Sequence, residues 1–317
     1  MGVVLSYPSN ISYHRLIVIH RLIVQMPTIK EISTSILTAL QPLYDPREAA
    51  AIANVYLGTK LKMERYELAL RGNEPVDESL IADIQRDMER LSQGCPVQYV
   101  LGETEFYGLP FEVSPAVLIP RQETEELVQR VVEQNKERSV RIWDVGTGSG
   151  CIAVSLAKML PEAQVYATDV SEEALQVARR NAERNGVGVT FARHDMRDME
   201  HLPFEGVRFD IVVSNPPYIP VSDRATMHRN VTEHEPSLAL FVPDDDKLWC
   251  YEAIARLGQR VLNANGAVYV ETYHDFHNEL IALFTQNGFG EARSFKDLNG
   301  QLRFVVANVV SPGITRT

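Results

Sequence analysis

The chain lacks a cysteine pattern that would suggest a metal site or a disulfide framework. Its three cysteines, Cys95, Cys151 and Cys250, are isolated and odd in number, which is typical of free thiols in a reducing cytoplasm. Positive charge is also scarce, since 31 Lys and Arg residues face 42 Asp and Glu residues, for a net charge of −11. Because phosphate binding leaves a basic footprint, this balance argues against duplex DNA as the main partner.

The chain has no apolar stretch long enough to span a membrane. Near its start, His14–Val18 recurs as His20–Val24, but Arg and His interrupt both copies. The segment also lacks the unbroken apolar core and small-residue cleavage site of a signal peptide. We expect residues 1–25 to be a disordered leader or a start-site artefact.

Length and composition indicate more than one globular domain. The chain has 317 residues, of which 45% are apolar and 23% charged, so two domains are the default expectation. From residue 26 to 93, apolar residues recur at three- and four-residue spacing, which predicts a small helical bundle. Its helices are expected to begin near Ile29, at the capping signal Asp45–Pro46, near Tyr66 and at Asp77.

The sequence pattern after residue 93 predicts a linker and a larger α/β domain. Between residues 94 and 120, the short aromatic segments Val97–Gly102 and Glu105–Val113 are punctuated by Gly and Pro, which predicts a β-hairpin. From 121 to 310, strands and helices alternate, which predicts a doubly wound, largely parallel sheet with ligands at the carboxyl ends of its strands. Strands are expected at 140–145, 164–168, 189–192, 209–214, 267–271, 291–295 and 302–307. Helices are expected at 126–134, 152–159, 171–185, 248–262 and 275–287.

A glycine-rich loop follows the first strand of this domain. Gly146, Gly148 and Gly150 permit a tight turn and let a ligand approach the backbone. Such a loop can serve NAD, FAD or S-adenosylmethionine, and two details favour the last. Ala153 stands where the dinucleotide fingerprint usually has its last glycine, although an Ala variant exists. Asp144, just ahead of the loop, would disfavour a pyrophosphate and could attract an ammonium group.

Acidic residues follow the next two strands. Asp169 ends the second strand, 23 residues after Gly146, where a carboxylate can accept hydrogen bonds from both ribose hydroxyls. The alternative is that Asp169 caps the helix starting at Ser171. After the third strand, Asp195 is placed to touch an adenine edge, with Met196 packing on the ring.

The most informative segment is Asn215-Pro216-Pro217-Tyr218, which follows the fourth strand and is called the elbow below. Both prolines lack a backbone N–H and restrict their own and the preceding residue's geometry. The elbow therefore presents a carboxamide, free carbonyl oxygens and an aromatic face at one point, an arrangement that suits the binding of a planar –NH2 group. An ordinary proline-rich turn is the alternative for these four residues alone.

Together, the glycine loop, Asp169 and the elbow follow the order found in methyltransferases that act on amide or exocyclic amine nitrogen. The sequence resembles the HemK/PrmC family, N5-glutamine methyltransferases that modify the Gly-Gly-Gln glutamine of peptide chain release factors. The resemblance runs from about residue 26 to 308. The segments that carry it are Leu118–Glu125, Asp144–Gly150, Asn215–Pro220, Glu235–Leu240 and Asp297–Arg303.

The chain departs from the family pattern in two places. Tyr273 stands where members often have Gly, and Pro243–Leu248 is unusually acidic. A sister family methylates a ribosomal protein glutamine, and the Arg-Gln-Glu-Thr-Glu form of residues 121–125 resembles the release-factor branch better.

The resemblance implies a seven-stranded, Rossmann-like class I methyltransferase sheet, preceded by a helical substrate-recognition domain (26–93) and the hairpin linker. It implies S-adenosyl-L-methionine as cofactor. The implied cofactor contacts are Gly146, Thr147, Gly148, Ser149, Gly150, Asp169, Met196 and Asn215. Further residues expected to border this pocket are Arg121, Thr124 and Glu125, although Thr124 could instead cap its helix. Glu125 and Asp144 compete for the methionine ammonium.

The expected chemistry is positioning rather than base catalysis. The Asn215 side-chain oxygen and the Pro216 carbonyl would accept the two N–H hydrogens of the substrate glutamine. Tyr218 would pack on the amide plane and exclude water, and Pro217 completes the substrate-binding elbow. His234 lies between carboxylates without a second ligand cluster, so no metal is expected.

Three rival functions remain at this point. An adenine-N6 nucleic-acid methyltransferase could use the same elbow, but the acidic charge counts against it. An NAD-dependent oxidoreductase would leave the elbow unexplained, and a non-catalytic binding protein would leave Asn215 and the glycine loop unexplained. We expect a cytoplasmic monomer that binds release factors, with no direct contact to nucleic acid or membrane.

Overall fold

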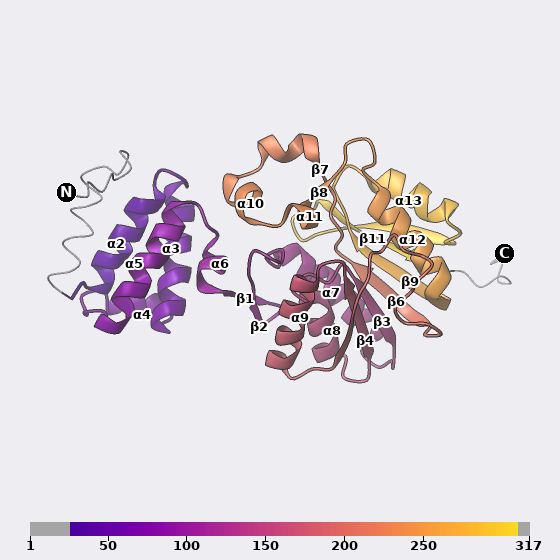
Figure 1. The fold of residues 1–317 in the computed structure, drawn as a ribbon, viewed down its shortest axis with the longest axis horizontal. Helices are drawn as coiled ribbons and strands as arrows, with labels where there is room; N and C mark the ends of the chain where they lie inside the picture. The colour runs from indigo at the N-terminus through magenta and orange to yellow at the C-terminus, as the bar shows by residue number, and fades with distance from the viewer. Residues whose placement is uncertain (1–25, 310–317) are drawn as a thin grey trace, which may run out of the picture. The chain divides into compact units, whose positions relative to one another are not determined.

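The structure is a computed structural model that describes residues 26–309, so the predicted leader lies outside the described residues. It divides into two compact units, the first ending at Leu101 and the second beginning at Gly102. Figure 1 shows the helices of the first unit in indigo to purple and the strands and helices of the second in magenta to yellow.

The first unit is helical, as the spacing of its apolar residues predicts. Its helices are α2 (Ile29–Leu40), α3 (Pro46–Leu61), α4 (Arg65–Leu70), α5 (Glu78–Ser92) and α6 (Val97–Leu101). The side chain of Asp45 accepts hydrogen bonds from the backbone N–H groups of Arg47 and Glu48, which confirms the predicted cap of α3. Ile36 and Leu40 on α2 and Tyr56 on α3 are fully buried in one apolar core.

The predicted hairpin begins later than its sequence suggested. Val97–Leu101 is helix α6 rather than strand, and Val97 and Val100 pack into the core of the helical unit. The hairpin strands are β1 (Glu103–Phe106) and β2 (Leu109–Glu112), paired antiparallel. Tyr107 and Gly108 between them both have positive φ, as a two-residue turn with matching twist requires.

The second unit is built on a seven-stranded sheet with the order β10-β11-β9-β6-β3-β4-β5. Its strands are β3 (Arg141–Val145), β4 (Gln164–Asp169), β5 (Val189–Arg193), β6 (Phe209–Ser214), β9 (Leu262–Glu271), β10 (Glu291–Lys296) and β11 (Leu302–Asn308). The pairs among β3, β4, β5, β6 and β9 are parallel, whereas β11 is antiparallel to both β9 and β10. The predicted doubly wound sheet is confirmed.

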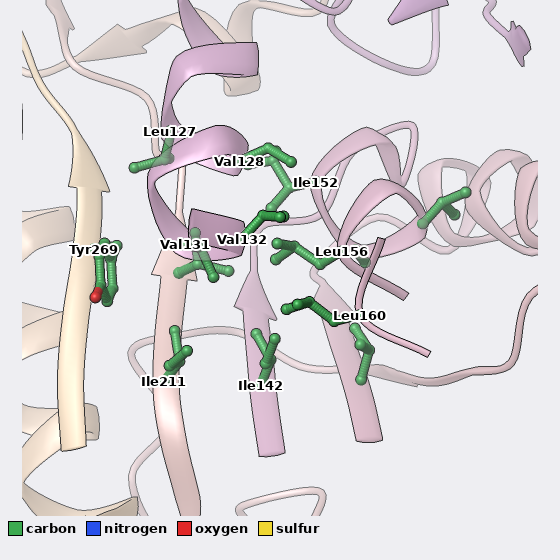
Figure 2. Packing of buried hydrophobic residues seen from close by; sticks show 14 of the residues in the cluster. Leu127, Val128, Val131, Val132, Ile142, Ile152, Leu156, Leu160, Ile211 and Tyr269 are labelled. Atoms are coloured by element: carbon green, nitrogen blue, oxygen red, sulfur yellow. The ribbon is translucent and has the colours of Figure 1, made fainter. Parts of the chain in front are cut away.

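Helices cover both faces of the sheet because its central strands are apolar on both sides. The larger helices are α7 (Gln122–Asn135), α8 (Cys151–Met159), α9 (Glu172–Asn185), α12 (Trp249–Val261) and α13 (His277–Gln286). Figure 2 shows Val131 of α7 directed toward the strand residues Ile211 and Ile142. On the other face, Trp143 and Val212 belong to the core that includes α12 and α13.

Sequence analysis missed the short elements between the elbow and α12. They are β7 (Ile219–Pro220), the 3-10 helix η1 (Val221–Thr226), α10 (Arg229–His234), α11 (Ser237–Leu240) and β8 (Phe241–Val242). Each is too short for apolar periodicity to mark it. Helix α7 also begins at Gln122 rather than at Glu126, and β9 at Leu262 rather than at Ala267.

Within residues 26–309, no helix is both long and apolar enough to cross a bilayer. The three cysteines form no disulfide within this range.

We predict that Phe209→Ala destabilises the second unit by about 3 to 5 kcal/mol. Phe209 has no exposed surface, and its ring centroid lies 5.1 Å from that of Trp143 and 5.2 Å from that of Tyr166, so its removal leaves a cavity among aromatic rings. Urea unfolding followed by tryptophan fluorescence measures this unit, because both tryptophans, Trp143 and Trp249, lie in it. Leu298→Ala, at a residue that is 90% exposed, is the control and changes the unfolding free energy by less than about 0.5 kcal/mol. Equal effects of the two substitutions would contradict the prediction.

Candidate functional site

The predicted site residues gather where the order of the parallel strands reverses. Strands β3 and β6 are neighbours, but β4 continues the sheet to one side and β9 to the other. The helices after β3 and after β6 consequently leave toward opposite faces, which opens a crevice at their carboxyl ends. The Ser214 Oγ donates a 2.6 Å hydrogen bond to the Val145 carbonyl oxygen and joins the two strand ends.

The glycine loop, residues 146–150, turns sharply from β3 into α8. Gly146, Gly148 and Gly150 all have positive φ, a conformation that disfavours other residues. At Gly150, an added Cβ would also lie 3.0 Å from the Ala178 Cβ. At Gly148, an added Cβ would meet nothing within 4 Å, so this part of the loop faces open space.

Asp169 at the end of β4 holds the loop in place. Its Oδ2 accepts the Gly148 N–H at 2.9 Å, and its Oδ1 accepts the Ser171 N–H at 2.9 Å. Helix α9 is instead capped by Ser171, whose Oγ accepts the Ala174 N–H. Burial raises the pKa of Asp169, while these backbone donors oppose the rise.

The segment after β5 forms another wall of the crevice. Met196 lies against the glycine loop, its Cε being 3.8 Å from the position of a Cβ on Gly146. Asp195 accepts hydrogen bonds from the Arg197 guanidinium, which lowers the pKa of Asp195. That guanidinium in turn lies 5.3 Å from the centre of the Trp249 ring.

The elbow after β6 is connected to α7 and β9 by side-chain hydrogen bonds. The Asn215 Nδ2 donates to the Thr124 Oγ1 at 3.1 Å, and the Thr124 Oγ1 donates to the Glu271 Oε2 at 2.7 Å. The Tyr218 hydroxyl donates to the Glu271 Oε1 at 3.0 Å. The Glu271 side chain therefore bonds directly to Tyr218 and is linked to Asn215 through Thr124.

Glu271 is a buried carboxyl group, only 1% exposed. Burial raises its pKa, while the hydrogen bonds from Thr124 and Tyr218 and the nearby positive charge of Arg303 lower it. The Tyr218 hydroxyl has a pKa well above its usual value because it is buried and faces this carboxyl group. It acts here as a hydrogen-bond donor.

A partly buried ion pair connects the start of α7 to the segment before α11. The Arg121 Nη2 lies 2.6 Å from the Glu235 Oε1, and the Glu235 Oε2 accepts the Ile119 N–H at 3.2 Å. Glu235 is 5% exposed. This pair brings the segment after Glu235 against the start of α7, although the two are more than a hundred residues apart in sequence.

These segments enclose a cavity of about 350 Å³, within the size range of small-molecule sites. The predicted residues that line it are Arg121, Thr124, Gly146, Thr147, Gly148, Ser149, Asp169, Asp195, Met196, Asn215 and Pro217. The structure thus brings most of the predicted site together in one cavity.

Other predicted residues do not line this cavity: Gly150, Pro216, Tyr218, Asp144 and Glu125. Gly150 and Pro216 each lie between two lining residues in the sequence, and Tyr218 donates a hydrogen bond to Glu271. Asp144 and Glu125, expected to compete for an ammonium group, point elsewhere. Asp144 is fully buried and accepts a 2.6 Å hydrogen bond from the Thr147 Oγ1, and Glu125 accepts the Tyr107 N–H of the hairpin.

The cavity suits an adenosine-type cofactor. Its floor is a glycine loop with open space over Gly148, next to a carboxylate that still has lone pairs available after accepting two N–H groups. His194 also lines the cavity, and its buried Nε2 has no hydrogen-bond partner among the described residues. Burial lowers the pKa of His194, which favours the neutral ring and one nitrogen able to accept.

Glu271 and Trp249 are site residues that sequence analysis missed. Trp249 lines the cavity but belongs to no recognised motif. In the sequence, Glu271 is only the last residue of an expected strand, and its partners Thr124 and Tyr218 lie 147 and 53 residues away. The available signal was its position at the carboxyl end of a strand next to β6. No cluster of three metal-ligating side chains occurs in residues 26–309.

We predict that Asp144 makes stability depend on pH. Burial raises the pKa of Asp144 from 3.8 to about 7, so the folded chain holds this proton more tightly than the unfolded chain. The resulting stabilisation is complete below about pH 4 and is lost as the pH rises through about 7. Relative to Asp144→Asn, which does not titrate, the wild type should lose about 2 to 3 kcal/mol of unfolding free energy between about pH 5 and 8. Urea titrations of both proteins measure this difference, and a constant difference would contradict the assignment.

Comparisons with known proteins agree with this architecture. A family model described as "PrmC N-terminal domain" matches residues 38–102, and one described as "Methyltransferase domain" matches residues 136–301. The catalytic domain of hMettl16, solved in complex with the MAT2A 3'UTR hairpin 1, covers 84% of this chain and 92% of its own, with a TM-score of 0.55 and 16% identity. That likeness shows the fold.

Curated relatives match almost end to end. The release factor glutamine methyltransferase of Flavobacterium psychrophilum is 39% identical over 284 residues, covering 88% of this chain and 99% of the relative. The protein of the same name from Bacteroides thetaiotaomicron is 40% identical over 281 residues, covering 87% and 99%. This chain belongs to the release factor glutamine methyltransferase family.

Proposed function

We propose that this protein transfers a methyl group from S-adenosylmethionine to the side-chain amide nitrogen, N5, of the glutamine in the Gly-Gly-Gln motif of peptide chain release factors. The observation that carries the proposal is the placement of Asn215. Asn215 follows β6, the neighbour of the strand that leads into the glycine loop, and lines the same cavity as that loop. A carboxamide that would bind the substrate amide thus lies beside the surface that would hold the cofactor.

The cofactor-binding part of the site would consist of the glycine loop, Asp169 and the wall around Met196. The carboxylate of Asp169 would accept hydrogen bonds from a ribose, and the open space over Gly148 would let the cofactor approach the loop backbone. When bound, S-adenosylmethionine supplies an activated methyl group on a positively charged sulfur. Since neither Asp144 nor Glu125 lines the cavity, we assign neither of them to the methionine ammonium.

The substrate-binding part would be the elbow. An amide nitrogen is a weak nucleophile because its lone pair is delocalised, so the protein must position it and increase its electron density. The Asn215 Oδ1 and the Pro216 carbonyl oxygen would accept the two N–H hydrogens of the substrate glutamine. Tyr218 would cover the amide plane, and the proton would leave after methyl transfer.

The partner is proposed to be a release factor, bound by a cytoplasmic, monomeric enzyme. The helical unit, residues 26–101, is proposed to recognise the protein substrate. Direct binding to nucleic acid is not expected, because the net charge is −11.

We predict that Asn215→Ala lowers methyl transfer to purified release factor by about a hundredfold or more, because a hydrogen-bond acceptor aimed at the reacting amide is lost. The measurement is incorporation of labelled methyl groups from S-adenosylmethionine into the factor. Wild-type enzyme is tested in parallel on a factor whose Gly-Gly-Gln glutamine is replaced by Ala, and this factor should remain unlabelled.

The distribution of label decides between substrates. Label that requires both Asn215 and the substrate glutamine supports the proposal. Label on a ribosomal protein instead would move the function to the sister activity, and label on nucleic acid would mean that the elbow grips an exocyclic amine. Labelling of the Gln→Ala factor would refute the assignment of the modified atom.

A second prediction concerns Asp169. Asp169→Ala should weaken S-adenosylmethionine binding by roughly tenfold to a hundredfold, because it removes a carboxylate acceptor and releases the Gly148 N–H. Calorimetric titration measures the affinity. The control is Glu172→Ala, which removes a carboxylate of the same region that pairs with Arg179 at the surface and lies outside the cavity lining. Affinity that falls equally in both variants would argue against a role for Asp169 in binding.

A further inference from the structure

Glu271, the last residue of β9, carries a buried carboxyl group that is 1% exposed. Burying a charged group is costly unless it is paired or hydrogen-bonded. The two carboxyl oxygens of Glu271 accept hydrogen bonds from the hydroxyl groups of two elements of the site, Thr124 of α7 and Tyr218 of the elbow. Because Thr124 donates to Glu271, the roles of donor and acceptor in the next hydrogen bond, between Thr124 and Asn215, are fixed.

These roles follow from proton counting. A Thr hydroxyl has a single proton to donate. Thr124 uses this proton on the Glu271 Oε2 at 2.7 Å, so toward Asn215 its oxygen can only accept. The side-chain atom of Asn215 that faces Thr124, 3.1 Å away, must therefore be the Nδ2 donor.

We propose that Thr124 and Glu271 are positioning residues that hold the Asn215 carboxamide with its Oδ1 directed toward the substrate amide. The inference rests on the proposed function, since it concerns how the elbow recognises a glutamine side chain. It adds to that function two residues that act through Asn215.

The orientation matters because a carboxamide is nearly symmetric in shape. Rotation by half a turn about its last side-chain bond exchanges oxygen and nitrogen with little steric change. The prolines after Asn215 restrict its backbone but leave this rotation open. In the rotated form the Nδ2 would point its hydrogens at the N–H hydrogens of the substrate, and binding of the reactive amide would be lost.

The same carboxyl group also orients the far end of the elbow. The Tyr218 hydroxyl donates to the Glu271 Oε1, while the backbone carbonyl of Glu271 accepts from the Tyr251 hydroxyl at 3.1 Å. Glu271 is thus held from α12 and itself holds both Thr124 and Tyr218. A shift of Glu271 would disturb the amide acceptor and the aromatic cover together.

The test compares Thr124→Val with Thr124→Ser. Valine keeps the shape of Thr124 but has no hydroxyl, so the Asn215 carboxamide can rotate; serine keeps the hydroxyl. At saturating S-adenosylmethionine and release factor, we expect kcat of Thr124→Val to fall roughly tenfold to a hundredfold. Thr124→Ser should recover most of that loss. Two measurements show whether each variant is folded: its affinity for S-adenosylmethionine, from calorimetry, and its thermal unfolding midpoint. If Thr124→Val does not fold, Thr124→Ala takes its place.

A double-mutant cycle separates positioning from general structural damage. If Thr124 acts through Asn215, adding Thr124→Val to Asn215→Ala should change the single-turnover rate by no more than roughly twofold. Additive losses would overturn the inference, because Thr124 would then act independently. Equal kcat for Thr124→Val and wild type would overturn it as well.

Failure of the proposed function and failure of the positioning role give different results. If the wild-type enzyme does not methylate the release-factor glutamine, the proposed function falls and this role falls with it. If the wild type is active but Thr124→Val is equally active, only the positioning role falls.

Discussion

Two hydrogen bonds into the Glu271 carboxyl group, from Thr124 and from Tyr218, join helix α7, strand β9 and the elbow around one buried group. Because a buried carboxylate is tolerated only while its lone pairs are occupied, moving any one of these elements leaves an unsatisfied group. The elbow is consequently positioned by tertiary contacts as well as by its two prolines. The glycine loop meets the same region through the hydrogen bond between Ser214 and Val145.

Sequence predicted the sheet well because its strands are short apolar runs bounded by polar or glycine-rich segments. Every predicted strand of the second unit is present, and the helix starts at Asp45 and Asp77 carry the expected side-chain caps. Val97–Leu101 was misplaced because its apolar residues pack in the helical core, which a five-residue pattern does not reveal. The elements between Ile219 and Val242 were missed since none is longer than six residues.

The site was predictable where chemistry is local and unpredictable where it depends on tertiary contact. The glycine loop, Asp169 and Asn215 lie at strand ends beside motifs with their own turn chemistry, and all of them line or enclose one cavity. The acidity of Asp144, just ahead of the loop, and of Glu125, in the first turn of α7, predicts contact with an ammonium group. The fold instead buries Asp144 and bonds Glu125 to the hairpin. Glu271 could not be recognised because its partners come from two distant segments.

A crystal structure of the enzyme with a glutamine-containing peptide and a non-transferable S-adenosylmethionine analogue tests the central claim most directly. We expect the peptide carboxamide nitrogen at hydrogen-bond distance from both the Asn215 Oδ1 and the Pro216 carbonyl oxygen, roughly 2.7 to 3.2 Å. Thr124 should remain bonded to the Asn215 Nδ2. A peptide amide bound away from Asn215, or facing its Nδ2, would contradict the account.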